Sequence, residues 1–87
     1  MVRLMLASVL AASLAQTTQV TPAEITAAIG KLGSFDLATR TDAARTVRRA
    51  PAELAVPALA KAARENTDGY VRYRALVLLG GFGDRKS

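Results

Sequence analysis

A short internal repeat constrains the fold of this chain more than any other feature of its sequence. When the sequence is shifted by 32 residues, two segments align, each with an aspartate, an arginine four residues later, an alanine and then an aliphatic residue. The aligned pairs are Asp36 and Asp68, Arg40 and Arg72, Ala43 and Ala75, and Val47 and Leu79. The aspartate can cap a helix and pair with the arginine one turn later. A period of this size predicts a helical solenoid.

The composition favours an all-α fold. Hydrophobic residues make up 51% of the 87 residues, and most of them are alanine, leucine and valine, which suit close packing of helices. Aromatic residues make up 5%, and the alternating β-branched pattern of strands is scarce. We therefore expect one small domain with four helices, at about residues 22–32, 36–49, 51–65 and 69–80.

Local signals place the ends of these helices. Thr21 and Glu24 form a capping box at the start of the first helix. Pro57 lies within the third helix, so we expect either a kink in its first turns or a start nearer Val56. The fourth helix is expected to end at Gly80-Gly81.

Two stretches carry a family pattern: Ala-Val-Pro-Ala-Leu at residues 55–59 and Tyr-Val-Arg-Tyr-Arg-Ala-Leu at residues 70–76. Together they resemble HEAT-like repeats, particularly the short type first described in phycobilisome lyases. The resemblance covers about residues 36–84, although Thr39-Arg40 stands where the family has Val-Arg and the second copy lacks its second helix. It implies a right-handed α-solenoid of antiparallel helix pairs. About one and a half repeats would occupy residues 36–87, behind an N-terminal capping helix in residues 22–35.

The C-terminal part of the pattern has an open face. Leu78, Leu79 and Phe82 are expected to point toward a further helix that the sequence does not contain. Each repeat buries its apolar face only against its neighbours, and three or more repeats are usual. Two interpretations follow: the chain is a fragment of a longer protein, which we favour, or the open end docks on a partner.

The N-terminus has the pattern of a secretory signal peptide. Arg3 precedes an apolar run over residues 4–14, and Ser13 and Ala15 are small residues at the two positions that a signal peptidase reads. We expect cleavage after Ala15, a disordered lead-in over residues 16–21, and a secreted or periplasmic protein with no membrane span after cleavage. Two alternatives are a helix that belongs to the fold and an uncleaved anchor; the run is short for a span.

The sequence offers little for catalysis. It contains no cysteine and no histidine, which removes thiol nucleophiles, the usual zinc ligands and the usual general base. Several carboxylates are explained as helix caps, and residues 80–83 follow no strand that could build a phosphate loop. We therefore predict a protein that is not an enzyme and needs no cofactor or metal.

The candidates for partner binding are basic and aromatic side chains on the predicted helices. They are Arg45, Arg48, Arg49, Lys61, Arg64, Tyr70 and Tyr73. The leading hypothesis is an exported, non-catalytic HEAT-repeat scaffold that binds an unidentified protein. One alternative is binding of a nucleic acid or an acidic ligand through the arginine-rich helix face, although export and the scarcity of aromatics count against nucleic acid. Another, implied by the resemblance, is an accessory subunit related to lyase-type repeat proteins.

Overall fold

The computed structural model describes residues 19–86 of the chain, and these residues fold into four α-helices with no β-strand among them. The helices are α2 (Pro22–Lys31), α3 (Leu37–Arg49), α4 (Ala52–Glu65) and α5 (Gly69–Lys86). The all-α prediction is therefore confirmed. The predicted signal peptide at residues 1–15 and the first part of the predicted lead-in lie outside the described residues.

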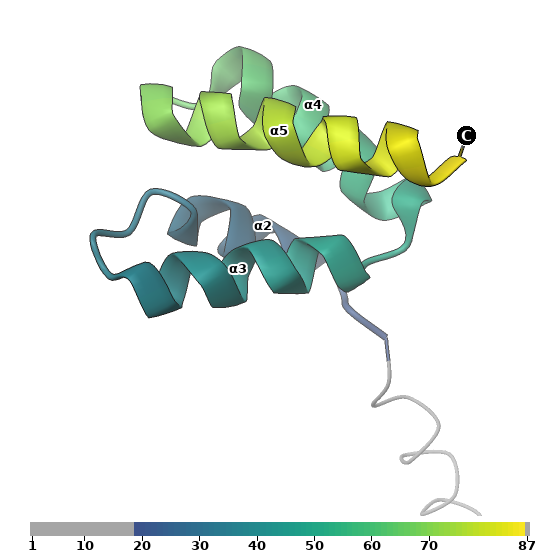
Figure 1. Ribbon diagram of the computed structural model, residues 1–87, viewed down its shortest axis with the longest axis horizontal. Helices are drawn as coiled ribbons and strands as arrows, with labels where there is room; N and C mark the ends of the chain where they lie inside the picture. Colours follow the sequence, from purple (N-terminus) through teal and green to yellow (C-terminus); the bar gives the residue numbers. More distant parts are fainter. Residues whose placement is uncertain (1–18, 87) are drawn as a thin grey trace, which may run out of the picture.

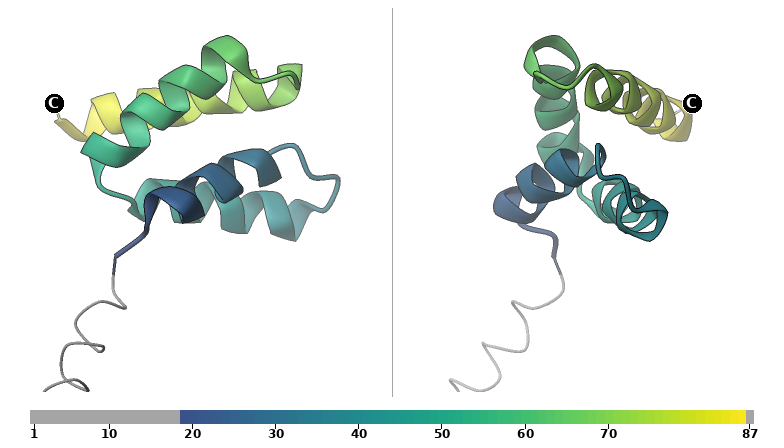
Figure 2. Two further views of the ribbon diagram at one scale, coloured as in Figure 1. Left: turned by 180° about the vertical axis from the view of Figure 1, so that it is seen from behind. Right: turned by 90° about the vertical axis from the view of Figure 1, so that its left-hand side faces the viewer.

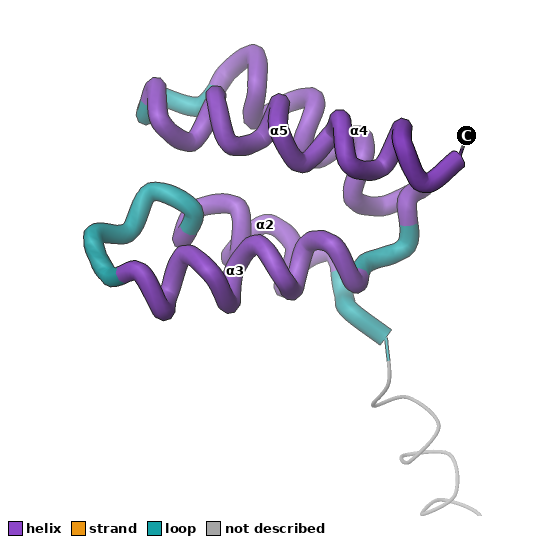
Figure 3. The backbone as a smooth tube through the Cα atoms, viewed as in Figure 1, coloured by secondary structure: helices purple, strands orange, loops and turns teal. Residues whose placement is uncertain are grey.

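The helices form two antiparallel hairpins, one stacked on the other. In Figure 1, α2 and α3 make the lower hairpin and α4 and α5 the upper one, with α3 and α5 running in the same direction at the front. The end-on view in Figure 2 places the four helices at the corners of a rough square. The most extensive contacts lie within the hairpins, and α2 also packs along α4. Figure 3 shows that short loops join the helices at the ends of this arrangement.

The starts of the helices follow the predicted caps. The Thr21 backbone N–H donates to Glu24 Oε1 at 3.0 Å, and the Glu24 N–H donates to Thr21 Oγ1 at 3.2 Å, which completes a capping box. Asp36 Oδ2 accepts the backbone N–H of Thr39 at 3.0 Å at the start of α3. Local sequence therefore fixes where the first hairpin begins each of its helices.

The predicted bounds of the third helix are confirmed to within one residue. Helix α4 begins at Ala52, and not at the alternative start near Val56, because the Pro51 carbonyl closes the first turn by accepting N–H groups from Leu54 and Ala55 at 3.0 and 2.9 Å. Pro57 lies within this helix, where it removes a single N–H, and its ring is exposed to solvent.

Helix α5 does not end at Gly80-Gly81, as the sequence predicted, but continues to Lys86. None of the glycines in the described residues has a positive φ, so this pair adopts ordinary helical geometry. Phe82, one residue beyond the pair, is only 4% exposed. Burial of this ring against the other helices offsets the low helix propensity of the two glycines.

The prediction that Leu78 and Phe82 face a missing helix is also wrong. Both side chains are 4% exposed and belong to the core formed by the four helices, and Leu79 is partly buried against it. The large apolar side chains that α5 exposes in its middle are instead Leu76, at 58%, and Val77, at 43%. The apolar stripe of α5 is thus covered by the other helices of the core.

Small residues let the helices approach closely in this core. Ala55 and Ala75 have no exposed surface, and Ala43 is 4% exposed. The larger buried side chains fill the space between the hairpins; among them are Ile25, Leu32, Val47, Leu59 and Val71. No charged side chain is buried among the described residues, so apolar packing between alanine-rich faces holds the two hairpins together.

The internal repeat reappears in the hydrogen bonds of the two helix-entry loops. Arg40 Nη1 donates to the Ser34 carbonyl oxygen at 2.7 Å, and Arg72 Nη1 donates to the Asn66 carbonyl oxygen at 2.6 Å. Each arginine therefore reaches back six residues and ties its helix to the preceding loop. The sequence had suggested a side-chain pair with the aspartate one turn earlier; the hydrogen bond goes to the loop backbone instead.

The two loops also share a turn before the aspartate. The backbone N–H of Asp36 donates to Ser34 Oγ at 3.1 Å, and that of Asp68 donates to Asn66 Oδ1 at 2.9 Å. Serine and asparagine can both accept this bond, so the repeat conserves the geometry while the residue type changes. The 32-residue repeat thus corresponds to two equivalent loop-to-helix junctions, at α3 and at α5.

Candidate functional site

The three arginines predicted to form a basic strip on α3 have different neighbours in the structure. Arg45 Nη1 lies 3.4 Å from Asp42 Oδ1, and this ion pair is well exposed to solvent. Arg49 lies near Glu24 of α2, where its charge helps to lower the pKa of that carboxyl. Arg48 faces α5. The spacing of three and four residues places all three on one face of α3, but Arg48 lies toward α5 and Arg49 toward α2, so the strip has no common neighbour.

The charge of Arg49 is a minor cause of the lowered pKa of Glu24. The largest cause is the hydrogen bond from the Thr21 backbone N–H, followed by the bond with the Thr21 hydroxyl. The pKa of Asp36 is also lowered, chiefly by the Thr39 hydroxyl and then by the Thr39 backbone N–H. Both carboxylates therefore serve as helix caps, and neither shows the raised pKa expected of a general acid.

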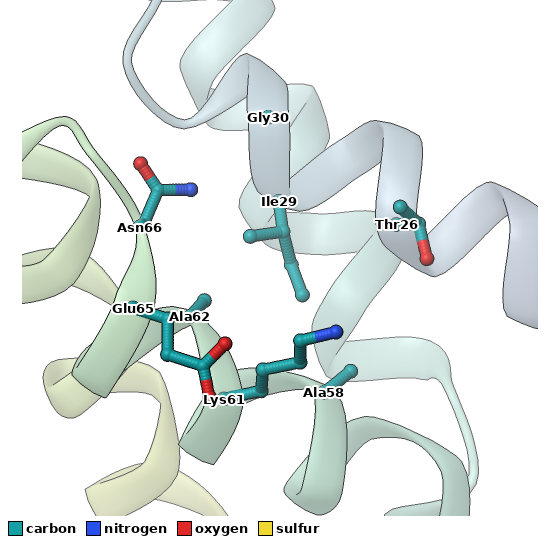
Figure 4. A pocket seen from close by; sticks show the side chains of 8 residues that line it. All are labelled: Thr26, Ile29, Gly30, Ala58, Lys61, Ala62, Glu65 and Asn66. Atoms are coloured by element: carbon teal, nitrogen blue, oxygen red, sulfur yellow. The ribbon is translucent and has the colours of Figure 1, made fainter.

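Lys61 lines a different cavity, of about 360 Å³, between α2 and α4. Figure 4 shows Ile29 reaching into this space from α2, with Lys61 and Glu65 along α4. One cation and one anion line the cavity, so it has no net preference for a charged ligand. Arg64 is exposed in the last turn of α4 and does not line this cavity.

A second cavity, of about 350 Å³, lies between α2 and α3 and carries more acid than base. Glu24 and Asp42 line it together with one cation, Lys31. Neither of these two cavities gathers the basic and aromatic candidates.

The groove between α3 and α5 does gather them. It consists of two adjoining cavities of about 320 Å³ each, which share Arg48 from α3 and Arg74 from α5. We call it the α3–α5 groove. Its lining residues are Leu32, Leu37, Arg40, Thr41, Ala44, Arg48, Tyr70, Arg74, Val77, Leu78, Gly81 and Phe82. They combine a basic rim with an apolar floor.

The electrostatics of the α3–α5 groove are one-sided. Arg40, Arg48 and Arg74 contribute three guanidinium groups, and no aspartate or glutamate within residues 19–83 belongs to the lining. Two of the floor residues, Ala44 and Leu78, are each 4% exposed. Cations above a low-dielectric floor attract anionic groups more strongly than the same cations on an open surface.

The two tyrosines lie at one end of this groove. Tyr70 lines it and is 49% exposed, whereas Tyr73, at 60%, is outside the lining. Their ring centroids are 6.4 Å apart with the planes tilted by 45°. Leu37, on the opposite helix, lines the same end and is 67% exposed. Together, Tyr70 and Leu37 give this end of the groove accessible apolar surface.

From the sequence, Arg40 was expected to pair with Asp36, and Arg74 was not among the predicted binding residues. In the structure, Arg40 donates a hydrogen bond to the Ser34 carbonyl and also lines the groove. A signal for Arg74 was available, because it follows Tyr70 by one helical turn and shares its face of α5. Only the packing of α5 beside α3 shows that this face lies opposite Arg48.

The chain matches no protein-family model, no curated protein and no solved structure. Within residues 19–86, acidic side chains form no group of three that could hold a metal ion. No helix in this part of the chain is both long enough and apolar enough to cross a membrane.

Proposed function

We propose that this protein is an exported, non-catalytic scaffold of the HEAT-like type that binds a protein partner through the α3–α5 groove. The observation that carries the proposal is the lining of that groove, which joins three guanidinium groups and a tyrosine to an apolar floor, with no carboxylate from residues 19–83. A polar rim around an apolar centre is the usual composition of a protein interface.

The repeat architecture supports the scaffold part of the proposal. The loop-to-helix junctions at α3 and α5 share the same hydrogen bonds, and the two hairpins stack with equivalent helices side by side. Stacked equivalent hairpins are the unit from which α-solenoids grow, and such proteins bind partners on the surface made by successive helices. Helices α3 and α5 are successive equivalent helices in this sense.

Nucleic-acid binding through the face with Arg45, Arg48 and Arg49 has less support. The three side chains have different neighbours, since Arg45 is paired with Asp42, Arg48 lines the α3–α5 groove and Arg49 lies near Glu24. Export is supported by the residue pattern at positions 1–15. Recovery of a mature chain that begins at Gln16 from outside the cytoplasm would support it; a cytoplasmic chain that retains residues 1–15 would contradict it.

Site-specific photocrosslinking tests the scaffold. Thr41 is exposed and lines the α3–α5 groove, whereas Ala27 is exposed and lines the cavity between α2 and α3. Each is replaced in turn by p-benzoylphenylalanine, and the cells that make the chain are irradiated. We expect a discrete protein adduct from position 41 and none from position 27. Absence of an adduct at position 41, or the same adducts from both positions, would contradict the proposed binding face.

A further inference from the structure

We infer that the α3–α5 groove binds an extended acidic peptide segment in which two carboxylates, four residues apart, flank an apolar side chain. This inference rests on the proposed function and names the chemistry of the partner. It follows from the spacing of the guanidinium groups, the floor between them and the charge of the lining.

The spacing comes from α3. Arg40 and Arg48 lie eight residues apart on this helix and both line the groove. At a rise of 1.5 Å per residue, their Cα atoms are about 12 Å apart along the helix axis. An extended peptide rises about 3.3 Å per residue, so four residues span about 13 Å, and the side chains at both ends point to the same face. Two carboxylates four residues apart therefore match the two arginines.

The floor between the arginines accounts for the apolar residue. Ala44 lies midway between Arg40 and Arg48 on α3, and its methyl group fills little of the space between the two arginines. From α5, Leu78 and Phe82 line the adjoining cavity, and each is 4% exposed. In an extended peptide the residue midway between the carboxylates points to the same face as they do. An aliphatic side chain there would cover Ala44.

The opposite wall supplies further donors. Arg74 lines both cavities and faces the peptide from α5, where it can donate to a carboxylate or to a main-chain carbonyl. Arg40 uses Nη1 for its bond to the Ser34 carbonyl, but a guanidinium carries five N–H donors and keeps its charge. The bond also holds the side chain in place, which reduces the conformational entropy lost on binding.

Charge complementarity selects an anionic occupant, and the floor selects a peptide over a nucleic acid. Of the four cavities described, the two that form this groove are the ones that residues 19–83 line with cations and with no carboxylate. Single-stranded nucleic acids bind where successive aromatic rings stack on the bases. Tyr70 is the one tyrosine in the lining, and the remaining floor suits an aliphatic side chain.

Fluorescence anisotropy with labelled peptides tests the inference on the purified chain. The probe has the core Glu-Thr-Leu-Thr-Glu, whose threonines favour an extended conformation. One control has glutamine in place of both glutamates, and another has the core Glu-Glu-Leu-Thr-Thr, with the same charge at the wrong spacing. We expect the probe to bind about tenfold more tightly than either control, as charge-assisted hydrogen bonds imply. Equal binding of the probe and the wrongly spaced peptide would overturn the inference.

Variants locate the binding. Arg74→Gln and, separately, Arg48→Gln are expected to weaken binding of the probe about tenfold. Arg64→Gln removes an exposed charge from α4 outside the groove and is expected to change binding less than about twofold. Far-UV circular dichroism confirms that each variant is folded, and the exposed position of Arg48 keeps the test valid should Arg74→Gln unfold. Unchanged binding in folded variants would overturn the inference.

Two further outcomes separate this inference from the proposed function. An oligothymidylate that binds more tightly than the probe and displaces it would overturn the peptide assignment in favour of a nucleic acid. A protein adduct at position 41 together with no binding of the acidic probe would leave the scaffold standing and refute the acidic partner. If there is neither a protein adduct at position 41 nor binding of the acidic probe, both the proposed scaffold function and the acidic partner are refuted.

Discussion

The contact between the first loop and α5 gives the most direct test of how the two hairpins stack. A Cβ added at Gly33 would lie 2.6 Å from Asp68 Oδ2 and 2.9 Å from Val71 Cγ2, closer than such atoms approach in folded proteins. Gly33 does not have a positive φ, so an alanine at this position meets no backbone penalty. The substitution Gly33→Ala therefore isolates the contact between the loop and α5.

The loss of stability expected for Gly33→Ala depends on whether the side chains of Val71 and Asp68 can move away from the added Cβ. Val71 is 2% exposed and β-branched, so its side chain has essentially one rotamer in a helix. The Asp68 carboxylate is more mobile, but its Oδ1 accepts the Tyr70 backbone N–H at 2.9 Å, and moving it weakens a helix cap worth about 1 kcal/mol. Overpacking costs about 1–3 kcal/mol, and the stiffer unfolded chain returns about 0.4–1 kcal/mol. We expect a net destabilisation of about 1–3 kcal/mol.

Urea unfolding followed by far-UV circular dichroism measures this effect, with Gly30→Ala as the matched control. Gly30 lies within α2, and an added Cβ there meets nothing within 4 Å. Gly30→Ala should therefore stabilise the chain by about 0.5–1 kcal/mol through helix propensity. If Gly33→Ala proves as stable as the unsubstituted chain or Gly30→Ala, the loop does not lie against α5 and the stacking is wrong.

Three other predictions test the core, the repeated junction and the caps. Leu78→Ala should cost about 2–5 kcal/mol in thermal unfolding, whereas Leu76→Ala, at a side chain 58% exposed, should cost less than about 0.5 kcal/mol; equal losses would contradict the orientation of α5. Arg72→Gln should cost about 1 kcal/mol in urea unfolding because the Asn66 carbonyl loses its donor, and an unchanged midpoint would show that the bond contributes nothing. The lowered pKa of Asp36 means that its stabilising effect is complete above the unfolded-state pKa and is lost as the pH falls below about 4. When the free energy of unfolding is measured against pH, Asp36→Asn should therefore lose less stability in acid than the unsubstituted chain. The same loss in both proteins would argue against the cap.

The candidate site was only partly predictable from sequence. Arg48 and Tyr70, both singled out by residue type, line the α3–α5 groove, whereas Arg45, Arg64 and Tyr73 do not. Residue type and helical spacing indicate which side chains share a face of one helix. They do not say which neighbouring helix that face meets, because packing between helices depends on residues distant in sequence.

The sequence alone determined the all-α class, the existence of four helices and the junctions that begin α3 and α5. These features depend on groups a few residues apart in the sequence, such as the Thr21–Glu24 capping box and the Asp36 cap that accepts the Thr39 N–H. Local hydrogen bonds and side-chain periodicity suffice to specify them.

The tertiary structure decided the end of α5, which helices cover its apolar face and the composition of the α3–α5 groove. Helix propensity predicted an end at Gly80-Gly81, but burial of Phe82 against the other helices outweighs the cost of two glycines. In the same way, Arg48 and Arg74 become neighbours only because the second hairpin stacks on the first. Burial between helices distant in sequence is the physical term that a local pattern does not contain.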